Sequence, residues 1–422
     1  PQGFLPLNSA TVRPNKVVPR PDQYVGVTTY AGNTSSVVVK DLSFKPDLVW
    51  VKGYTDADRH GWYDSVRGVQ KRLQTAHALD QDTQNGVMSF NDNGFSIGNY
   101  GDSNGNGRGY VAWAWKAGGN KNTFNIDYVG YSTAGDANMG ISDLNSATYN
   151  TSNRWSDDYS GATIDSSYPI TQAFDGNRST ASRVSATQTA MSVDLTNITV
   201  ADKIEVRGEL GYITPYVSVT VGGFTHQIGG DPSTLISGSA GTTSRVITGV
   251  SGALTNVTVG RVSSGRTFLS QILVDGKILV DDNITPPNAP SIAATGASVG
   301  TKQGFSIIKY TGTGTAGTIS HGLSSAPACI FVKTLDDAYN WFVYHKGVDV
   351  SASDYYLRLN TNNARVDSSN AWNDTAPTST MFTVGTDGSV NESGDDYIAY
   401  LWHDVPGLQK FGSYEANGNV DG

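Results

Sequence analysis

One stretch of the chain occurs twice, and this duplication limits what the chain can fold into. The motif GWYDSVRGV is repeated as NWFVYHKGV, and YVAWAW is repeated as YIAYLW. The aligned segments are residues 24–52 with 304–333, 61–69 with 340–348, 94–98 with 381–385, and 110–115 with 397–402. Because their order is kept and the gaps between them are small, we interpret each copy, roughly a hundred residues long, as one folding unit.

Within each copy, short runs of β-branched and aromatic residues alternate with Gly, Asn and Asp. Such runs predict short strands joined by tight turns. In residues 110–115, the period of two places Val111, Trp113 and Trp115 on one face and the small Ala112 and Ala114 on the other. We expect the large face to fill the core of its own sandwich rather than to bind a ligand.

Composition supports a β architecture. The chain has 48 glycines and only 16% charged residues, and it contains no long run rich in Ala, Glu, Lys and Leu. Its 422 residues exceed the size at which one hydrophobic core stops growing. We therefore predict an all-β protein built from tandem antiparallel β-sandwich domains of the jelly-roll-like kind.

The duplication also predicts the order of the domains. We expect a Pro-rich lead or linker (1–23), a first β-sandwich repeat (24–120), a linker (121–141), a middle β-sandwich (142–285), a second linker (286–303) and a second repeat (304–407). Residues 411–422, FGSYEANGNVDG, resemble the start of both copies. We interpret residues 408–422 as the start of a third repeat or as a C-terminal tail, and the sequence as part of a longer polypeptide.

Charge and cysteine content exclude several classes of protein. The net charge is -9 with a pI near 5.1, and no basic cluster is present, which argues against binding to nucleic acid or to an anionic membrane. No apolar run is long enough for membrane insertion. Cys329 is the only cysteine, so no internal disulfide can form.

The repeats resemble a domain that recurs in tail-fibre-like and other virion proteins of marine phages, especially those of cyanobacteria. The matching motifs are FKPDLVWVK, YDSVRGV, NGFSIG and YVAWAWKAGG. The resemblance implies a virion structural protein at the particle surface, namely a fibre, a spike or a head-decoration component that contributes to host adsorption. It also implies other virion proteins as partners and, by analogy with fibres, a homotrimer. The second copy departs from the pattern, with Ala328 and Lys346 at the positions of Asp47 and Arg67.

The middle segment resembles a galactose-binding, discoidin-like sandwich. The resemblance depends on AFDGNRST at residues 173–180 and ILVDGKILVD at residues 272–281. In that family the first of these loops often holds a structural calcium ion. The matching positions here are Asp175, Asn177 and Thr180. A glycan on the host cell surface is the ligand that this resemblance implies.

The polar motif NRWSDDY at residues 153–159 contains the candidate ligand contacts. Sugars present C–H faces that stack on aromatic rings and hydroxyls that bond to carboxylates and guanidinium groups. The candidates are Trp155, Asp157, Asp158 and Tyr159, with Arg178 and Arg183 as additional contacts. In the alternative interpretation, Trp155 plugs the core beneath the sheet.

The sequence does not predict an enzyme. The six histidines show no HExxH or other metal-ligand spacing. A catalytic pair of carboxylates would meet only in space, so a glycan depolymerase stays open as one alternative to a structural protein. The other alternative is an adhesin that binds carbohydrate through its middle domain.

Overall fold

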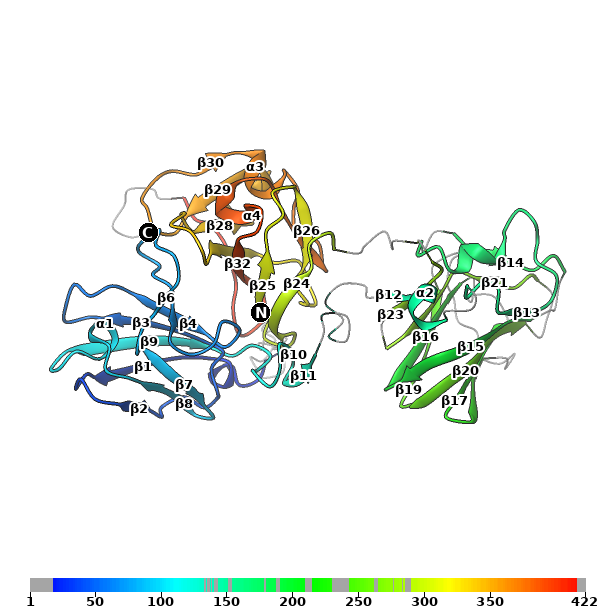
Figure 1. Ribbon diagram of the computed structural model, residues 1–422, viewed down its shortest axis with the longest axis horizontal. Helices are drawn as coiled ribbons and strands as arrows, with labels where there is room; N and C mark the ends of the chain where they lie inside the picture. Colours follow the sequence, from blue (N-terminus) through cyan, green and yellow to red (C-terminus); the bar gives the residue numbers. More distant parts are fainter. Residues whose placement is uncertain are drawn as a thin grey trace, which may run out of the picture. The chain divides into compact units, whose positions relative to one another are not determined.

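A computed structural model gives the fold of the chain (Figure 1). It describes residues 18–132, 134, 137, 139, 143–150, 154–177, 180–186, 190–208, 215–229, 243–261, 265–275, 277–282, 284 and 290–415. The chain divides into two compact units. The first, which we call the repeat unit, comprises Pro1–Gly140 and Pro290–Gly422, and the second, the inserted unit, comprises Ile141–Ala289.

Strands dominate both units, which confirms the predicted all-β class. The described helices are single turns: η1 (Pro21–Gln23), α1 (Gly101–Asn104), α2 (Ser146–Tyr149), η2 (Ile170–Ala173), η3 (Ala352–Asp354), α3 (Ser369–Trp372) and α4 (Gly388–Asn391). Within the described ranges, no helix has both the length and the apolar character needed to cross a membrane.

The first copy folds as two facing sheets. One is a four-stranded antiparallel sheet in the order β1-β9-β3-β4, and the other has the order β2-β8-β7. The strands are β1 (Val25–Ala31), β2 (Val37–Val39), β3 (Leu48–Gly53), β4 (Gly61–Asp64), β7 (Val87–Asn91), β8 (Gly94–Ile97) and β9 (Gly109–Trp115), with a small pair formed by β5 (Lys71–Arg72) and β6 (Asp82–Thr83).

The second copy repeats this order as β25-β32-β27-β28 in a nine-stranded sheet. Its strands are β24 (Ala294–Gly300), β25 (Phe305–Thr311), β26 (Gly317–Ser320), β27 (Cys329–Thr334), β28 (Phe342–His345), β29 (Tyr355–Arg358), β30 (Val366–Asp367), β31 (Met381–Val384) and β32 (Asp396–Trp402). Strands β26 and β31 pair with each other, as β2 and β8 do in the first copy.

Register and side-chain contacts confirm the duplication. Tyr30 pairs with Tyr110 between β1 and β9, and the aligned Tyr310 pairs with Tyr397 between β25 and β32. The short helices α1 and α4 are equivalent as well. The hydroxyl of the β9 tyrosine donates to the main-chain oxygen of the first residue of α1 at 2.7 Å, and that of the β32 tyrosine donates to the first residue of α4 at 2.6 Å.

The two faces of β9 alternate as predicted, but they contact different partners from those expected. Tyr110, Ala112 and Ala114 are buried inside the first sandwich, whereas Trp113 and Trp115 are only half-buried. The prediction that the large face fills its own core is therefore wrong. The alanines leave room for the facing sheet to approach, and the indoles lie on the outside of the sandwich.

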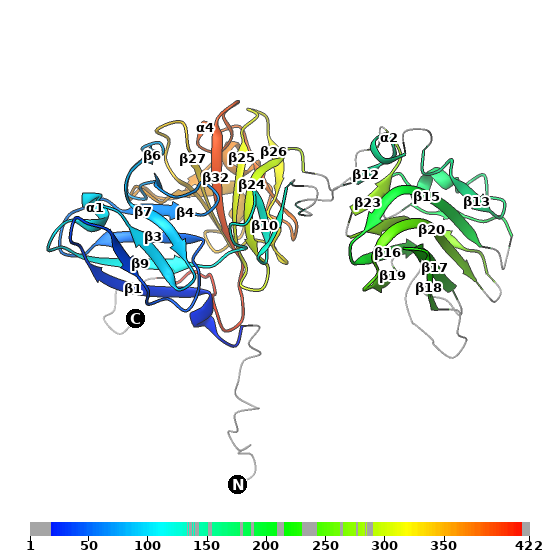
Figure 2. The ribbon, with the colours of Figure 1, turned by 60° about the horizontal axis from the view of Figure 1, so that its bottom comes forward.

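The second copy covers part of this outer aromatic face. In Figure 2 the sheet that contains β3 and β9 lies beside the long sheet that contains β25 and β32. Trp62 contacts its aligned counterpart Trp341 with ring centroids 5.8 Å apart, and Trp115 contacts its counterpart Trp402 at 6.5 Å. Contact between equivalent residues is the pattern of an isologous, two-fold interface. The duplicated chain thus resembles a dimer fused into one polypeptide.

A buried ion pair lies inside this junction on one side only. Asp64 and Arg67 bond to each other with almost no exposed side-chain surface, and the Tyr400 hydroxyl donates to Asp64 Oδ2 at 2.6 Å. In the second copy, His345 lies opposite Cys329 as Asp64 lies opposite the aligned Leu48, and Lys346 aligns with Arg67 in the sequence. The junction is therefore not symmetric: Tyr400 is fully buried, whereas its counterpart Trp113 is half-buried. The second copy in turn buries Lys333, on the same face of β27 as Cys329 and Phe331.

The segments expected as linkers, 121–141 and 286–303, contribute strands to the second copy. Strand β10 (Phe124–Ile126) pairs antiparallel with β11 (Val129–Tyr131) and parallel with β24. A close approach at Gly118 permits this pairing, because a Cβ there would lie 2.4 Å from the main-chain oxygen of Val299. The buried carboxylate of Asp47 accepts hydrogen bonds from the amides of Ala117 and Gly119 and fixes the preceding turn.

The inserted unit is a sandwich of two five-stranded sheets around one apolar core. The first sheet has the order β12-β23-β22-β16-β19 and the second has the order β13-β15-β20-β17-β18. The strands are β12 (Asp143–Asn145), β13 (Tyr159–Gly161), β15 (Met191–Val200), β16 (Lys203–Gly208), β17 (Pro215–Val221), β18 (Phe224–Gly229), β19 (Thr243–Thr248), β20 (Gly252–Arg261), β22 (Gln271–Val274) and β23 (Lys277–Val280), with a small pair of β14 (Ser182–Arg183) and β21 (Phe268–Leu269).

Candidate functional site

The inserted unit contains the candidate site residues that were predicted from the sequence. The most prominent of them, Trp155, is buried in the core of the unit. Trp155 has no exposed surface and lies among the apolar core residues. Its Nε1 donates to the main-chain oxygen of Leu144 at 2.7 Å, so the indole N–H is satisfied inside the protein. This burial corrects the expectation that Trp155 contacts a ligand, because an indole without exposed surface cannot stack on a sugar. It matches the alternative interpretation of Trp155 as a plug.

The neighbouring candidates mainly stabilise their own loop. Asp157 is exposed and accepts a hydrogen bond from the amide of Arg154 at 3.2 Å. Asp158 accepts a bond from the side-chain amide of Asn150. The Tyr159 hydroxyl donates to a main-chain oxygen within its own turn, and burial raises the pKa of Tyr159. Arg178 lies outside the described residues.

The three residues predicted to hold calcium do lie together. The Thr180 hydroxyl is 2.7 Å from Asp175 Oδ2 and 2.9 Å from the main-chain oxygen of Asn177. Carboxylate, carbonyl and hydroxyl oxygens are the ligands that calcium prefers. Among the described residues, no cluster of three or more His, Cys, Asp or Glu side chains could hold a metal ion. Calcium therefore stays a prediction for this loop.

A polar cavity of about 310 Å³ lies beside the same loop. Arg154 pairs with Asp282 in its wall at 2.6 Å. The neighbouring Asp281 is almost fully buried, its carboxylate accepts two hydrogen bonds from Ser156, and burial raises its pKa. These contacts tie residues 154–156 to the end of the last described strand of the unit, and the cavity offers no aromatic surface to a ligand.

An exposed aromatic group in the inserted unit lies elsewhere, beside the β14–β21 pair. The guanidinium of Arg183 is 4.0 Å from the ring centroid of Tyr168 and 5.7 Å from that of Phe268. Asp165 bonds to Arg183 and lies 3.2 Å from Arg266. The hydrogen bond from Arg183 lowers the pKa of Asp165, so this carboxylate is charged at neutral pH. We call Asp165, Tyr168, Arg183, Arg266 and Phe268 the arginine–tyrosine cluster.

Of the candidate ligand contacts predicted from the sequence, Arg183 is the one that belongs to this cluster. Tyr168 stands in a stretch of Ser, Asp and Pro that carries no recognisable motif. Pairing of Ser182 with Leu269 brings residues 165–168, 183 and 266–268 together from three separate segments. No local pattern predicts such a meeting.

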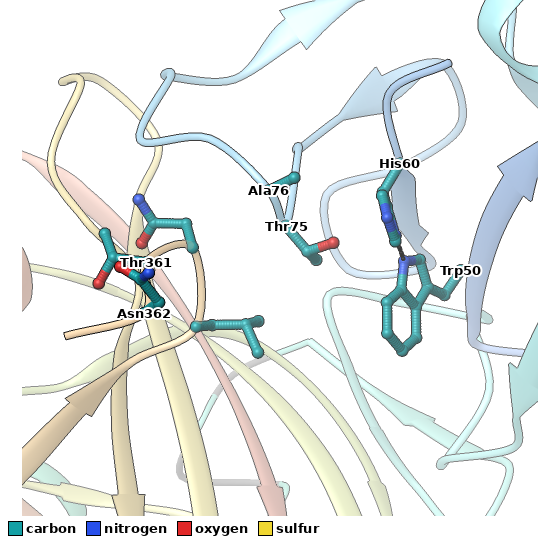
Figure 3. Close-up of a pocket in the computed structure, with 8 residues that line it drawn as sticks. Trp50, His60, Thr75, Ala76, Thr361 and Asn362 are labelled. Carbon is teal, nitrogen blue, oxygen red and sulfur yellow. Dashed lines mark hydrogen bonds between the residues drawn. The ribbon is translucent and has the colours of Figure 1, made fainter. Parts of the chain in front are cut away.

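The repeat unit contains a second candidate site, a cavity of about 560 Å³ that sequence reasoning missed (Figure 3). It is lined by residues of both copies: Trp50, His60, Thr75 and Ala76 from the first, and Leu359, Asn360, Thr361 and Asn362 from the second. We call it the junction cavity.

Equivalent loops of the two copies face each other across the junction cavity. Leu73 donates its amide to the main-chain oxygen of Trp62 at 3.1 Å, and Leu359 donates to that of the aligned Trp341 at 3.3 Å. RLQTA at residues 72–76 is therefore the counterpart of RLNTN at residues 358–362. More residues separate NWFVYHKGV from RLNTN in the second copy than separate GWYDSVRGV from RLQTA in the first. An alignment that allows only small gaps therefore does not detect this match.

A tryptophan–histidine pair forms one wall of the junction cavity. Trp50 Nε1 donates to His60 Nδ1 at 2.9 Å (Figure 3). Because an indole nitrogen only donates, His60 Nδ1 carries no proton here, and its other nitrogen, Nε2, carries the hydrogen. Burial, followed by the charges of Lys52 and His77, lowers the pKa of His60, so the imidazole is neutral at pH 7.

Among the solved structures to which the chain is similar, three consist of carbohydrate-binding modules of the CBM32 type. CpGH89CBM32-4 of Clostridium perfringens, in complex with GlcNAc-α-1,4-galactose, is 16% identical with a TM-score of 0.23, over 29% of this chain and 94% of that one. The family 32 module of C. perfringens NanJ, in complex with galactose, is 14% identical with a TM-score of 0.22, over 28% and 95%. The CBM32-1 and CBM32-2 domains of C. perfringens ZmpB are 10% identical with a TM-score of 0.21, over 60% and 92%.

Comparison with protein families identifies the repeats. No curated protein sequence matches the chain. The family model described as a domain of unknown function, DUF7483, matches residues 20–128 and 284–422. These two stretches contain both copies of the repeat and make up more than half of the chain, so the chain belongs to the DUF7483 family.

Proposed function

We propose that the chain is a non-enzymatic adhesion protein whose inserted unit binds a glycan on a host cell surface, while the paired repeats form its scaffold. The observation that carries this proposal is the arginine–tyrosine cluster. Tyr168 is 38% exposed, and a guanidinium held in place by Asp165 lies against its ring. An accessible ring with fixed hydrogen-bond donors beside it is the combination that a sugar requires.

The cluster is arranged before any ligand arrives. Asp165 orients Arg183 and Arg266, and the two aromatic rings flank the Arg183 guanidinium. Little side-chain entropy is then lost on binding, since the long arginine side chain is already ordered. Hydroxyl groups of a sugar can accept from the guanidinium groups and donate to the carboxylate of Asp165.

We further propose that the scaffold is a component of a phage particle surface, with other virion proteins as its partners. The resemblance of the repeat motifs to virion domains supports this assignment to a fibre, a spike or a head decoration. A homotrimer is the assembly proposed by analogy with phage fibres.

Binding of the full chain to an array of host-surface polysaccharides tests the glycan proposal. We expect Tyr168→Ala and Arg183→Ala each to weaken binding about tenfold, which corresponds to the loss of one aromatic contact or one charge-assisted hydrogen bond. Phe224→Ala is the matched control, because Phe224 is a 73% exposed aromatic residue of the same unit. Equal binding by all variants, or no binding to any polysaccharide, would contradict the proposal.

A further inference from the structure

The junction cavity has the composition of a ligand site rather than of a packing defect. Its volume of about 560 Å³ falls within the range of small-molecule sites. One wall is the half-buried indole of Trp50, and the second copy contributes Leu359 together with the amide and hydroxyl side chains of residues 360–362. Figure 3 shows Trp50 and His60 on one side of the space and Thr361 and Asn362 on the other, with Thr75 and Ala76 between them.

The aromatic wall is rigid and presents its ring to the cavity. Trp50 packs on Trp113 with ring centroids 4.9 Å apart and on Trp62 at 5.5 Å. The indole N–H of Trp50 already donates to His60, so the ring has no unsatisfied hydrogen-bond donor. Such a ring offers a flat apolar surface, onto which the C–H face of a sugar ring stacks.

The polar groups of the junction cavity suit a ligand rich in hydroxyls. His60 Nε2–H donates to no protein atom in the described part of the chain and is available as a directed donor. Asn362 is exposed at the opposite wall, and its amide can both donate and accept. Asn360 is held in place, because its Oδ1 accepts from the Trp341 amide at 3.0 Å and its Nδ2 donates to Asn340 at 2.8 Å.

The lining also indicates the charge of the ligand. Among the described residues, no Asp, Glu, Lys or Arg side chain lines the junction cavity. A phosphate or carboxylate group would find no cationic partner there and would lose its hydration shell without compensation. An uncharged ligand avoids this cost.

The repeat fold does not require the tryptophan–histidine pair. The second copy has Phe331 at the position of Trp50 and no histidine at residues 339–341, which precede β28, and it folds into the same sheet order. Likewise, the first copy has Ala76 at the position of Asn362. Each copy thus contributes to the junction cavity a polar residue that its counterpart lacks. We propose that the junction cavity is a second carbohydrate site, which binds an uncharged sugar between Trp50 and His60 of the first copy and Asn362 of the second.

The test uses the full chain with the arginine–tyrosine cluster disabled by Tyr168→Ala and Arg183→Ala, so that this cluster gives no signal. Saturation-transfer NMR is recorded with lactose, maltose and cellobiose, and glucuronate serves as the charged comparison. We expect saturation transfer to at least one neutral disaccharide and none to glucuronate. Trp50→Phe combined with Asn362→Ala, both taken from the other copy, should weaken that binding about tenfold.

Tyr54→Phe is the matched control, since Tyr54 is a 62% exposed aromatic residue of the same copy outside the cavity lining. Thermal unfolding checks that each variant is folded. The inference is overturned if none of the three disaccharides binds, if glucuronate binds in their place, or if the folded Trp50→Phe/Asn362→Ala protein keeps the parent affinity. Because the Trp50→Phe/Asn362→Ala protein and its parent carry the same changes in the inserted unit, a difference in affinity between them reports on the junction cavity whether or not the arginine–tyrosine cluster binds a glycan.

Discussion

At the scale of single residues, the junction between the copies depends on a charge that has no counterpart. Asp64 is fully buried, pairs with Arg67 and accepts the Tyr400 hydroxyl from the other copy. A buried ion pair seldom adds net stability, but removing one partner leaves a charge without compensation in the interior. The pair therefore distinguishes the correct junction from any arrangement in which Asp64 and Arg67 would face apolar groups alone.

Asp64→Val, which replaces the carboxylate with an apolar side chain, should destabilise the repeat unit by about 3–5 kcal/mol because Arg67 is left buried without its carboxylate partner. Urea unfolding measures this change. In the double variant Asp64→Val/Arg67→Met, most of the loss should be recovered. Asp22→Val serves as control, because Asp22 pairs with Arg20 at the surface and should leave the free energy of unfolding unchanged. An unchanged free energy for Asp64→Val would contradict this interpretation.

His321 should make the stability of the repeat unit depend on pH. Its side chain is fully buried, Nδ1 accepts from the amide of Leu323 at 3.1 Å, and burial lowers its pKa to about 4. The unfolded chain binds a proton near pH 6.5, so stability falls as the pH drops from 6.5 to 4, by about 3 kcal/mol for this group.

His321→Asn keeps an acceptor for the Leu323 amide and removes the titrating ring. Urea unfolding at pH 7 and at pH 4.5 should therefore show a smaller loss of stability for this variant than for the parent chain. The same substitution at the exposed His77 should leave the loss unchanged. Equal losses for the parent and for His321→Asn would refute the role of this histidine.

At the scale of single elements, strand β9 shows how far the sequence predicts the fold. The alternation of large and small side chains in YVAWAW predicted the two faces correctly. It could not predict what covers each face. Alternation places the side chains of a strand on two faces, but it does not specify which sheet packs against either face. The contact of Trp115 with Trp402 depends on the meeting of two sheets whose strands are far apart in the chain.

The candidate sites were less predictable than the strands. Trp155 stands in a polar motif, but its indole enters the core and bonds to Leu144. The polar composition of residues 153–159 predicts a loop. It does not predict whether the one large indole in that loop is exposed or packs into the core. The arginine–tyrosine cluster and the junction cavity each combine segments that only the folded chain brings together, so no local motif could indicate them.

A larger side chain at an inward-facing alanine of β9 should lower the free energy of unfolding of the repeat unit. Ala114 is fully buried against the facing sheet, so Ala114→Leu should cost about 1–3 kcal/mol through overpacking. Guanidinium unfolding gives the value. Val38→Leu, at a 51% exposed position of β2, should have no effect and is the control. If Ala114→Leu is as stable as the parent chain, the assignment of the inner face is wrong.

At the scale of the whole molecule, the duplication produces a joined pair. Trp62 and Trp115 of the first copy share one apolar cluster with Trp341, Tyr400 and Trp402 of the second, so the two copies pack together through part of their aromatic faces. The inserted unit leaves the repeat unit after β11 and returns before β24, and β10 and β24 pair in parallel around that point. The organisation therefore comprises one scaffold of two joined copies and one inserted sandwich with its own core.

The most direct test of this organisation is hydrogen–deuterium exchange on the full chain with Trp62→Ala. The substitution removes a buried ring that belongs to the first copy and contacts Trp341 and Tyr400 of the second. If the copies form one body, amide exchange in β27 and β32 should accelerate at least about tenfold, together with exchange in β3 and β9, while β15 and β20 of the inserted unit stay unchanged. Faster exchange confined to the first copy would show that the copies fold separately and would contradict the account.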